Sequence, residues 1–95
     1  MSWTIDDRKL NKTVFRSMPR NVQVKWTLWV EVVLSEGPDA LNNYTGFKDE
    51  GLTGEWKGCR SSRLSGGYRV IYERTDEALV VKVERVSNHD YKKRS

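Results

Sequence analysis

The sequence contains little of what disulfide-bonded, metal-binding and membrane proteins need. Among its 95 residues there is one cysteine, Cys59, and one histidine, His89. A single cysteine excludes an internal disulfide, and with a single histidine it cannot complete a tetrahedral metal site, so we expect no metal or cofactor. No run reaches the ~18 apolar residues that span a bilayer, and the residues after Met1 are not a basic and then apolar leader. These absences predict a cytoplasmic protein with no membrane partner.

The composition is that of a folded protein with an excess of positive charge. Hydrophobic residues make up 37% of the chain and charged residues 32%, which is typical of a globular protein rather than a disordered one. A chain of this length buries one core, so we expect a single domain over residues 1–95. The formal net charge is +4 with a pI near 9.4. This charge favours an anionic partner such as nucleic acid, although it is also common in proteins that bind none.

The first half of the sequence predicts two helices. Residues 3–5 are apolar enough for a short strand, after which Asp6 or Asp7 can cap a helix that Pro19 ends. Its apolar positions recur at spacing four: Leu10, Val14 and Met18. A second helix is predicted over residues 20–34, closed by a Gly-Pro pair. Its apolar face comprises Val22, Trp26, Trp29, Val30 and Val33.

The second half predicts an irregular connection followed by an antiparallel meander. Residues 37–55 are rich in Gly, Asn and Asp, with four anchors to the core: Leu41, Tyr44, Phe47 and Leu52. Strands are predicted over residues 56–64, 68–73 and 79–86. We therefore expect an α+β fold in which two N-terminal helices pack on one face of a twisted antiparallel β-sheet. Alternation along the middle strand puts Val70 and Tyr72 on one face, with Arg69 and Ile71 on the other.

The predicted hairpin carries more arginine than solubility requires. Arg60 and Arg63 precede its turn and Arg69 follows it, while His89 comes after the last strand with Tyr91 two residues later. Arginine offers a planar fork that matches phosphate oxygens and stays charged, whereas histidine exchanges a proton near neutral pH. This combination indicates phosphate chemistry.

The order of elements and three short motifs resemble the RelE/ParE superfamily of bacterial toxins. The motifs are LTGEWKG at 52–58, YRVIY at 68–72 and HDY at 89–91. The resemblance is strongest toward the RelE-like and YafQ-like branch. It implies a small basic toxin held in check by a cognate antitoxin, acting as an endoribonuclease that enters the ribosomal A site and cuts messenger RNA there. The ParE branch inhibits DNA gyrase instead, so a gyrase inhibitor, or an RNA- or antitoxin-binding module without catalysis, remains an alternative.

The resemblance also implies which residues act. It assigns catalysis to Arg60, Arg63, Arg69, His89 and Tyr91. Four further basic residues are candidate RNA-backbone contacts or simply solvated charges: Lys57, Lys92, Lys93 and Arg94.

RNA cleavage without a metal needs three groups, which deprotonate the ribose 2′-OH, neutralise the phosphorane and protonate the leaving 5′-oxygen. His89 suits the proton transfers, Arg60 and Arg69 suit the charge, and Tyr91 could stack on a base or orient the phosphate.

Some relatives carry residues that this chain lacks. They have a histidine near Glu50, a histidine at the position of Arg63 and an acidic residue at the position of Gly67. The general base is therefore open, with Glu50 as one candidate.

Each candidate also has a purely structural explanation. The arginines Arg60 and Arg63 suit a solvated sheet face, and His89 suits a surface position. Cys59 is expected to be a small buried filler, and Trp26 and Trp29 to be core residues rather than a nucleic-acid platform.

Overall fold

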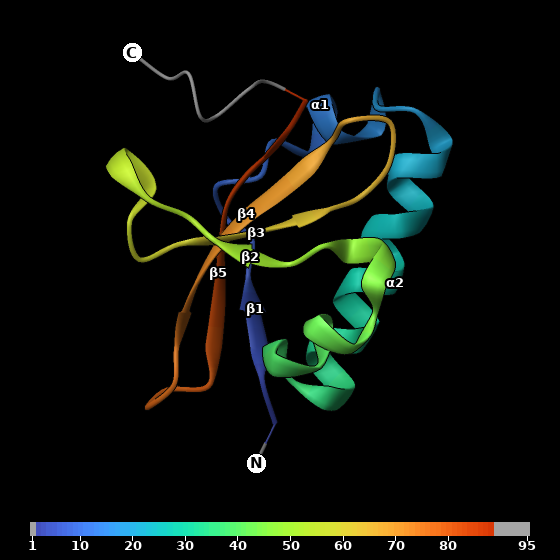
Figure 1. The fold of residues 1–95 in the computed structure, drawn as a ribbon. Coiled ribbons are helices and arrows are strands. Elements are labelled where there is room, and N and C mark those ends of the chain that lie inside the picture. Colours follow the sequence, from blue (N-terminus) through green and yellow to red (C-terminus); the bar gives the residue numbers. More distant parts are fainter. Residues whose placement is uncertain (1, 89–95) are drawn as a thin grey trace.

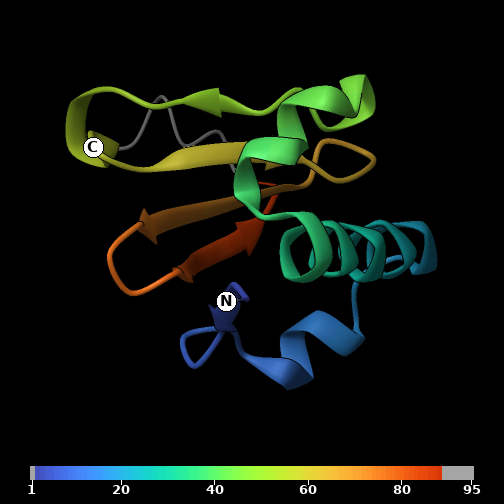
Figure 2. The ribbon, with the colours of Figure 1, turned by 90° about the horizontal axis from the view of Figure 1, so that it is seen from below.

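The computed structural model describes residues 2–88, which form a five-stranded sheet with helices against one of its faces (Figures 1 and 2). The elements in chain order are β1 (Thr4–Asp6), α1 (Lys12–Arg16), α2 (Arg20–Glu36), the 3₁₀ helices η1 (Pro38–Asn43) and η2 (Thr45–Phe47), β2 (Glu50–Gly51), the 3₁₀ helix η3 (Gly54–Trp56), β3 (Arg60–Arg63), β4 (Arg69–Thr75) and β5 (Val80–Ser87). None of the helices within the described residues is long and apolar enough to cross a membrane.

The strand order is β1-β5-β4-β3-β2. Strands β3, β4 and β5 pair antiparallel, as the predicted meander requires, and this confirms the α+β fold class. Strand β2 was not predicted, and it pairs antiparallel with β3. Strand β1 confirms the short strand predicted over residues 3–5, shifted by one residue, and pairs parallel with β5 over Thr4 to Asp6. The sheet is therefore mixed, with the N-terminal strand at one edge.

Helix α1 is shorter than predicted and has a different cap. The predicted caps were Asp6 and Asp7, but Asp6 belongs to β1, and its carboxylate accepts a hydrogen bond from Nη2 of Arg8 at 2.9 Å. The N-cap is Asn11, whose Oδ1 accepts hydrogen bonds from the backbone N–H groups of Thr13 and Val14 at 2.9 and 3.1 Å. The early acidic residues thus form the end of a strand and a turn, so the helix begins later in the sequence than predicted.

Helix α2 confirms the longer predicted helix and continues two residues further. It begins after Pro19 and ends at Gly37, whose φ of 88° lies in the left-handed region. A Cβ atom at Gly37 would come within 3.0 Å of the Trp3 side chain, so this position needs glycine for space as well as conformation. Trp29 is fully buried, and Trp26 stacks on it at 5.4 Å between ring centroids. Both tryptophans are core residues, as expected.

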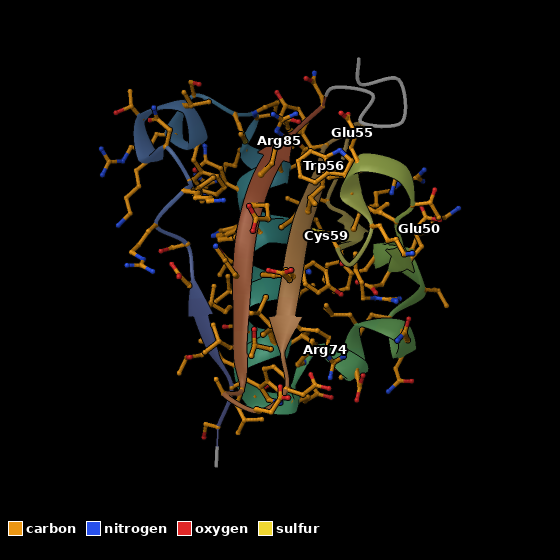
Figure 3. The ribbon with its side chains drawn as sticks, turned by 90° about the vertical axis from the view of Figure 1, so that its left-hand side faces the viewer. Glu50, Glu55, Trp56, Cys59, Arg74 and Arg85 are labelled. Carbon is orange, nitrogen blue, oxygen red and sulfur yellow. The ribbon has the colours of Figure 1, made fainter. Side chains whose placement is uncertain are left out.

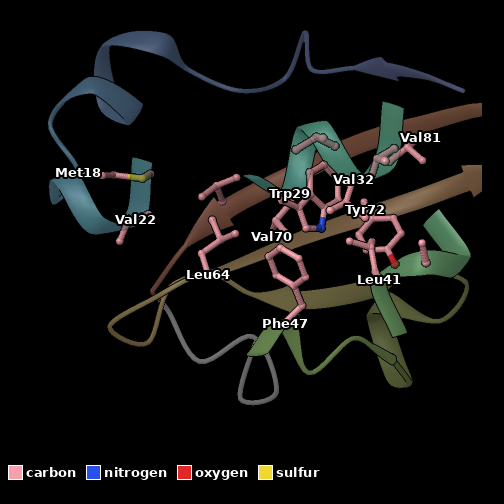
Figure 4. Packing of buried hydrophobic residues seen from close by; sticks show 14 residues of the cluster. Met18, Val22, Trp29, Val32, Leu41, Phe47, Leu64, Val70, Tyr72 and Val81 are labelled. Atoms are coloured by element: carbon pink, nitrogen blue, oxygen red, sulfur yellow. The ribbon is translucent and has the colours of Figure 1, made fainter. Parts of the chain in front are cut away.

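The main core lies between α2 and the sheet (Figure 4). From the sheet it takes Val70, Tyr72, Val81, Val83 and Val86. Three of the four predicted loop anchors are buried, namely Leu41, Phe47 and Leu52. The fourth, Tyr44, is exposed, because its hydroxyl donates a hydrogen bond to the surface carboxylate of Glu36 at 2.7 Å.

The opposite face of the sheet, turned toward the viewer in Figure 3, has no helix of the described chain packed across it. We call it the open face. It carries a small second cluster in which Leu52 and Ile71 are buried and Trp56 and Cys59 are partly buried. The 3₁₀ helix η3 follows β2 after two residues and places Trp56 at the edge of that cluster.

Candidate functional site

Strand register brings three arginines onto the open face. Arg63 and Arg69 are register partners across β3 and β4. Arg85 is the register partner of Ile71, which belongs to the open-face cluster. Side chains alternate along a strand, so Arg69 and Arg85 share that face as diagonal neighbours, typically about 7–8 Å apart. These three residues, Arg63, Arg69 and Arg85, are called the arginine group below.

Arg85 was missed by sequence reasoning for a physical reason. Strict alternation along β5 would put Arg85 on the core face with Val81 and Val83. The register shifts between Ile71 and Tyr72, whose partners are Arg85 and Val83, so Glu84 is an extra residue on β5. This β-bulge turns Arg85 to the open face and returns Val86 to the core.

A carboxylate lies beside the arginine group. Glu50 on β2 is the register partner of Ser61, and Ser61 is the register partner of Ile71. Glu50 therefore lies on the open face, in one cross-strand row with Ile71. Its Oε2 lies 3.8 Å from Nη1 of Arg69. The Arg69 side chain is only 22% exposed, so its charge is held near the sheet. The open face therefore has both a basic group and an acid–base candidate.

Arg60 is on the opposite face from Arg63 and Arg69. Its Nε donates a hydrogen bond of 2.6 Å to Oδ1 of Asp49, whose side chain has 0% exposure. Burial acts to lower the pKa of Arg60, but the hydrogen bond and charge of Asp49 outweigh it, and the pKa is raised. The structure thus separates Arg60 from the two arginines with which the sequence grouped it.

Asp49 is the centre of a buried polar network that the sequence did not reveal. Its Oδ2 accepts hydrogen bonds from the hydroxyls of Ser62, at 2.6 Å, and Tyr72, at 2.5 Å. The Ser62 hydroxyl also accepts one from Nε1 of Trp29 at 3.0 Å. Burial, followed by the bond to Asp49, raises the pKa of Tyr72. Since Asp49 directly precedes Glu50, the network fixes the start of the strand that presents Glu50 on the open face.

Trp56 and Arg85 are in contact at the edge of the open face (Figure 3). The Cζ atom of Arg85 lies 5.5 Å from the centroid of the Trp56 ring, within the range of a cation–π interaction. Cys59 lies in the same cluster, and burial raises the pKa of its thiol, so the thiol is protonated at neutral pH. This state agrees with the expected role of Cys59 as a filler.

The remaining predicted residues fall outside this arrangement or outside the described chain. Lys57 is exposed and follows η3. Five residues lie outside the described residues: His89, Tyr91, Lys92, Lys93 and Arg94. Strand β5 ends at Ser87, the register partner of Arg69. Within residues 2–88, no three His, Cys, Asp or Glu side chains are grouped so that they could hold a metal ion.

Comparison with known proteins identifies the fold. No protein-family model matches the sequence, and no curated protein does. Among solved structures, a chain of the RelE–RelB complex from Pyrococcus horikoshii matches with a TM-score of 0.69 and 21% identity, over 92% of this chain and 94% of that chain. A chain of the YoeB–YefM complex from Staphylococcus aureus matches with a TM-score of 0.68 and 19% identity, over 93% and 98%. A chain of the Escherichia coli DinJ–YafQ complex matches with a TM-score of 0.60 and 23% identity, over 94% of both.

The chain therefore has the fold of the RelE-like toxins. This confirms, at the level of the fold, the resemblance inferred from the motifs. Structures of RelE, YoeB and YafQ proteins are among those that share it.

Proposed function

We propose that the protein is the toxin of a toxin–antitoxin pair and cuts messenger RNA on the ribosome. The observation that carries this proposal is the arginine group on the open face, in a fold shared with RelE, YoeB and YafQ proteins. Three of the similar structures are described as toxin–antitoxin complexes, which supports a cognate antitoxin as partner.

The open face offers Glu50, Arg63 and Arg69 for the first two steps of the cleavage. His89 and Tyr91, which lie outside the described residues, are assigned to the other roles from the resemblance. In the proposed reaction, Glu50 accepts the proton of the ribose 2′-OH, and the 2′-oxygen attacks the phosphorus. Arg69 and Arg63 stabilise the phosphorane, since guanidinium forks match its equatorial oxygens. His89 donates a proton to the 5′-oxygen as the bond to phosphorus breaks, leaving a 2′,3′-cyclic phosphate. Tyr91 is assigned to orienting the phosphate or stacking on a base.

Arg60 has a different role in this proposal. Its hydrogen bond to a carboxylate with no exposed surface ties β3 to the residue before Glu50. We therefore assign Arg60 to positioning the β2 strand, while Arg63 and Arg69 contact the phosphate.

The test is to express the chain inducibly and map the 5′ ends of cellular transcripts. We expect in-frame cuts near codon boundaries, and purified protein should cut naked RNA poorly, because the ribosome supplies the substrate positioning that is worth several powers of ten in rate. Arg69→Ala and Glu50→Gln should abolish the cuts. Equal cleavage of naked and ribosome-bound messenger would contradict ribosome dependence. Toxicity that survives in His89→Ala, with gyrase inhibited and transcripts intact, would favour a gyrase inhibitor instead.

A further inference from the structure

Arg85 differs from Arg69 in how it is held. The Cζ atom of Arg85 lies over the Trp56 ring, 5.5 Å from its centroid, whereas Arg69 lies beside the carboxylate of Glu50. Trp56 is itself held in place, since it packs against Leu52 and Ile71 in the open-face cluster. Arg85 is nevertheless an exposed residue. The result is a supported planar cation that is accessible from solvent.

Room for a planar ligand lies next to this cation. Arg85 borders a groove of about 310 Å³ between the segment leading into α1 and β5. The groove has apolar walls that include Leu10, Val14 and Val86, and Lys9 and Glu84 pair at its rim at 2.6 Å. Its volume is at the small end of the range for ligand sites, which suits a single nucleobase better than a larger group.

We propose that Arg85, held on Trp56, is a stacking platform for one nucleobase of single-stranded RNA, next to the phosphate bound by Arg69 and Arg63. This inference rests on the proposed function and adds a contact for the base to it. Bases of single-stranded RNA stack on guanidinium planes as well as on aromatic rings. Arg85 is the contact residue, and Trp56 is a positioning residue that holds the guanidinium at the open-face cluster.

The location favours RNA over an acidic peptide as the ligand. A carboxylate is bound through the N–H edge of a guanidinium and needs no aromatic support, whereas the Cζ atom of Arg85 is held over the Trp56 ring. In addition, the diagonal neighbour Arg69 places a phosphate-binding group beside the platform, as a nucleotide requires. A base and its adjacent phosphate can therefore be bound together.

The test is a scan with abasic nucleotides. Binding of the full-length chain is measured by fluorescence anisotropy with a labelled hexaribonucleotide whose 2′-oxygens are all methylated, so that it cannot be cut. Parallel hexanucleotides each lack one base, at successive positions. The variants are Arg85→Lys, which keeps the charge but loses the plane, Trp56→Leu, which loses the ring, and Trp56→Phe, which keeps a ring. Lys82→Gln is the matched control, because it removes one positive charge elsewhere on β5.

We expect Arg85→Lys and Trp56→Leu to weaken binding of the intact hexanucleotide roughly tenfold, the effect of losing one stacked base. At one abasic position this difference from wild type should disappear. Trp56→Phe should restore most of the affinity, and Lys82→Gln should weaken all hexanucleotides by the same factor. Thermal unfolding shows whether Trp56→Leu is folded; if it is not, the surface variant Arg85→Lys carries the test.

Two results would overturn the platform. One is an unchanged ratio of intact to abasic affinity in Arg85→Lys, and the other is no binding of any hexanucleotide by the wild-type chain. The proposed function can fail separately, since it depends on cleavage on the ribosome, which this binding experiment does not measure. If the Arg85→Lys variant cut messenger normally and showed no abasic effect, the platform would be wrong and the proposed function would still stand.

Discussion

At the scale of single residues, the most constrained side chain of the described structure is Asp49. Its carboxylate has 0% exposure and accepts hydrogen bonds from Arg60, Ser62 and Tyr72. A buried charge is tolerated only when its hydrogen bonds are made, and here three donors supply them. Loss of the negative charge would leave the Arg60 guanidinium partly buried without its counter-ion.

We predict that Asp49→Asn lowers the free energy of unfolding by about 3 kcal/mol, because breaking one side of a buried pair leaves the partner charge uncompensated. The measurement is urea unfolding at neutral pH. Asp39→Asn is the matched control, since the Asp39 carboxylate also pairs with an arginine, Arg74, at 2.6 Å but is 86% exposed. An exposed pair contributes about 0–1 kcal/mol, so this variant should lose much less. Similar losses in both variants would contradict a special role for the buried network.

A second prediction concerns alkaline pH and Tyr72. Burial and the hydrogen bond to Asp49 raise the pKa of Tyr72 above the ordinary value of 10.0, so the folded chain keeps this proton when the unfolded chain has released it. The unfolded state then binds fewer protons, and the free energy of unfolding falls as pH rises above about 10. Tyr72→Phe removes this contribution. Its free energy of unfolding should lie below wild type at pH 8, by about 1 kcal/mol for the lost hydrogen bond, and the two curves should converge above about pH 10. Parallel curves across this range would show that Tyr72 does not titrate differently in the two states.

At the scale of elements, the alternation of side chains decides what each arginine does. Arg60 and Arg63 are three residues apart on β3, so they must face opposite sides of the sheet. The core side contains Asp49, which binds Arg60, while Arg63 shares the open face with Arg69. The same type of residue therefore serves structure on one face and the proposed chemistry on the other.

This difference predicts opposite effects for two alanine variants. Arg60→Ala should lower the free energy of unfolding by about 3 kcal/mol, because Asp49 loses its counter-ion in the interior. Arg69→Ala should change it by less than about 1 kcal/mol, because the partner carboxylate of Glu50 is 45% exposed and no buried charge is left without its counter-ion. The same variant should lower the single-turnover cleavage rate on programmed ribosomes more than tenfold, an effect typical of losing a donor that stabilises the transition state. The measurements are urea unfolding and quenched-flow cleavage. Unchanged cleavage with weaker ribosome binding would reassign Arg69 to docking.

The sequence predicted the bounds of the long elements and of β1 well, but it made α1 and β3 too long and did not predict β2. Helix α2 and strands β4 and β5 have long apolar patterns, and they lie within two residues of the predicted ends. The pairing of β1 with β5 and the bulge at Glu84 depend on contacts between segments far apart in the sequence, which local patterns do not contain. The sequence groups Arg60 with Arg63, and the contact that separates their roles is the one between Arg60 and Asp49, in a segment predicted to be an irregular loop. The face on which Arg85 lies could not be predicted without knowledge of the bulge at Glu84.

At the scale of the whole molecule, the described chain presents two different surfaces. The open face carries the arginine group. The helical side exposes several large apolar side chains instead: Val14, Val24, Leu28 and Leu34. The net charge is +4, so an acidic partner would be attracted to the molecule in general, but charge complementarity favours the open face. An antitoxin segment that folds on binding could use either surface, with different consequences for inhibition.

The last prediction rests on the proposed function: a cognate antitoxin would cover the open face and so block the arginine group. Hydrogen exchange of the chain alone and in the complex is the measurement. Amides within β4 are already protected by the sheet, so the informative reporters are the loop amides of residues 53–58, around Trp56, whose exchange should slow on binding. The apolar side of α2 gives the comparison within the same data set. If exchange slowed only within residues 12–36, masking of the arginines would be wrong, and the antitoxin would have to act by making the complex too large for the ribosomal A site.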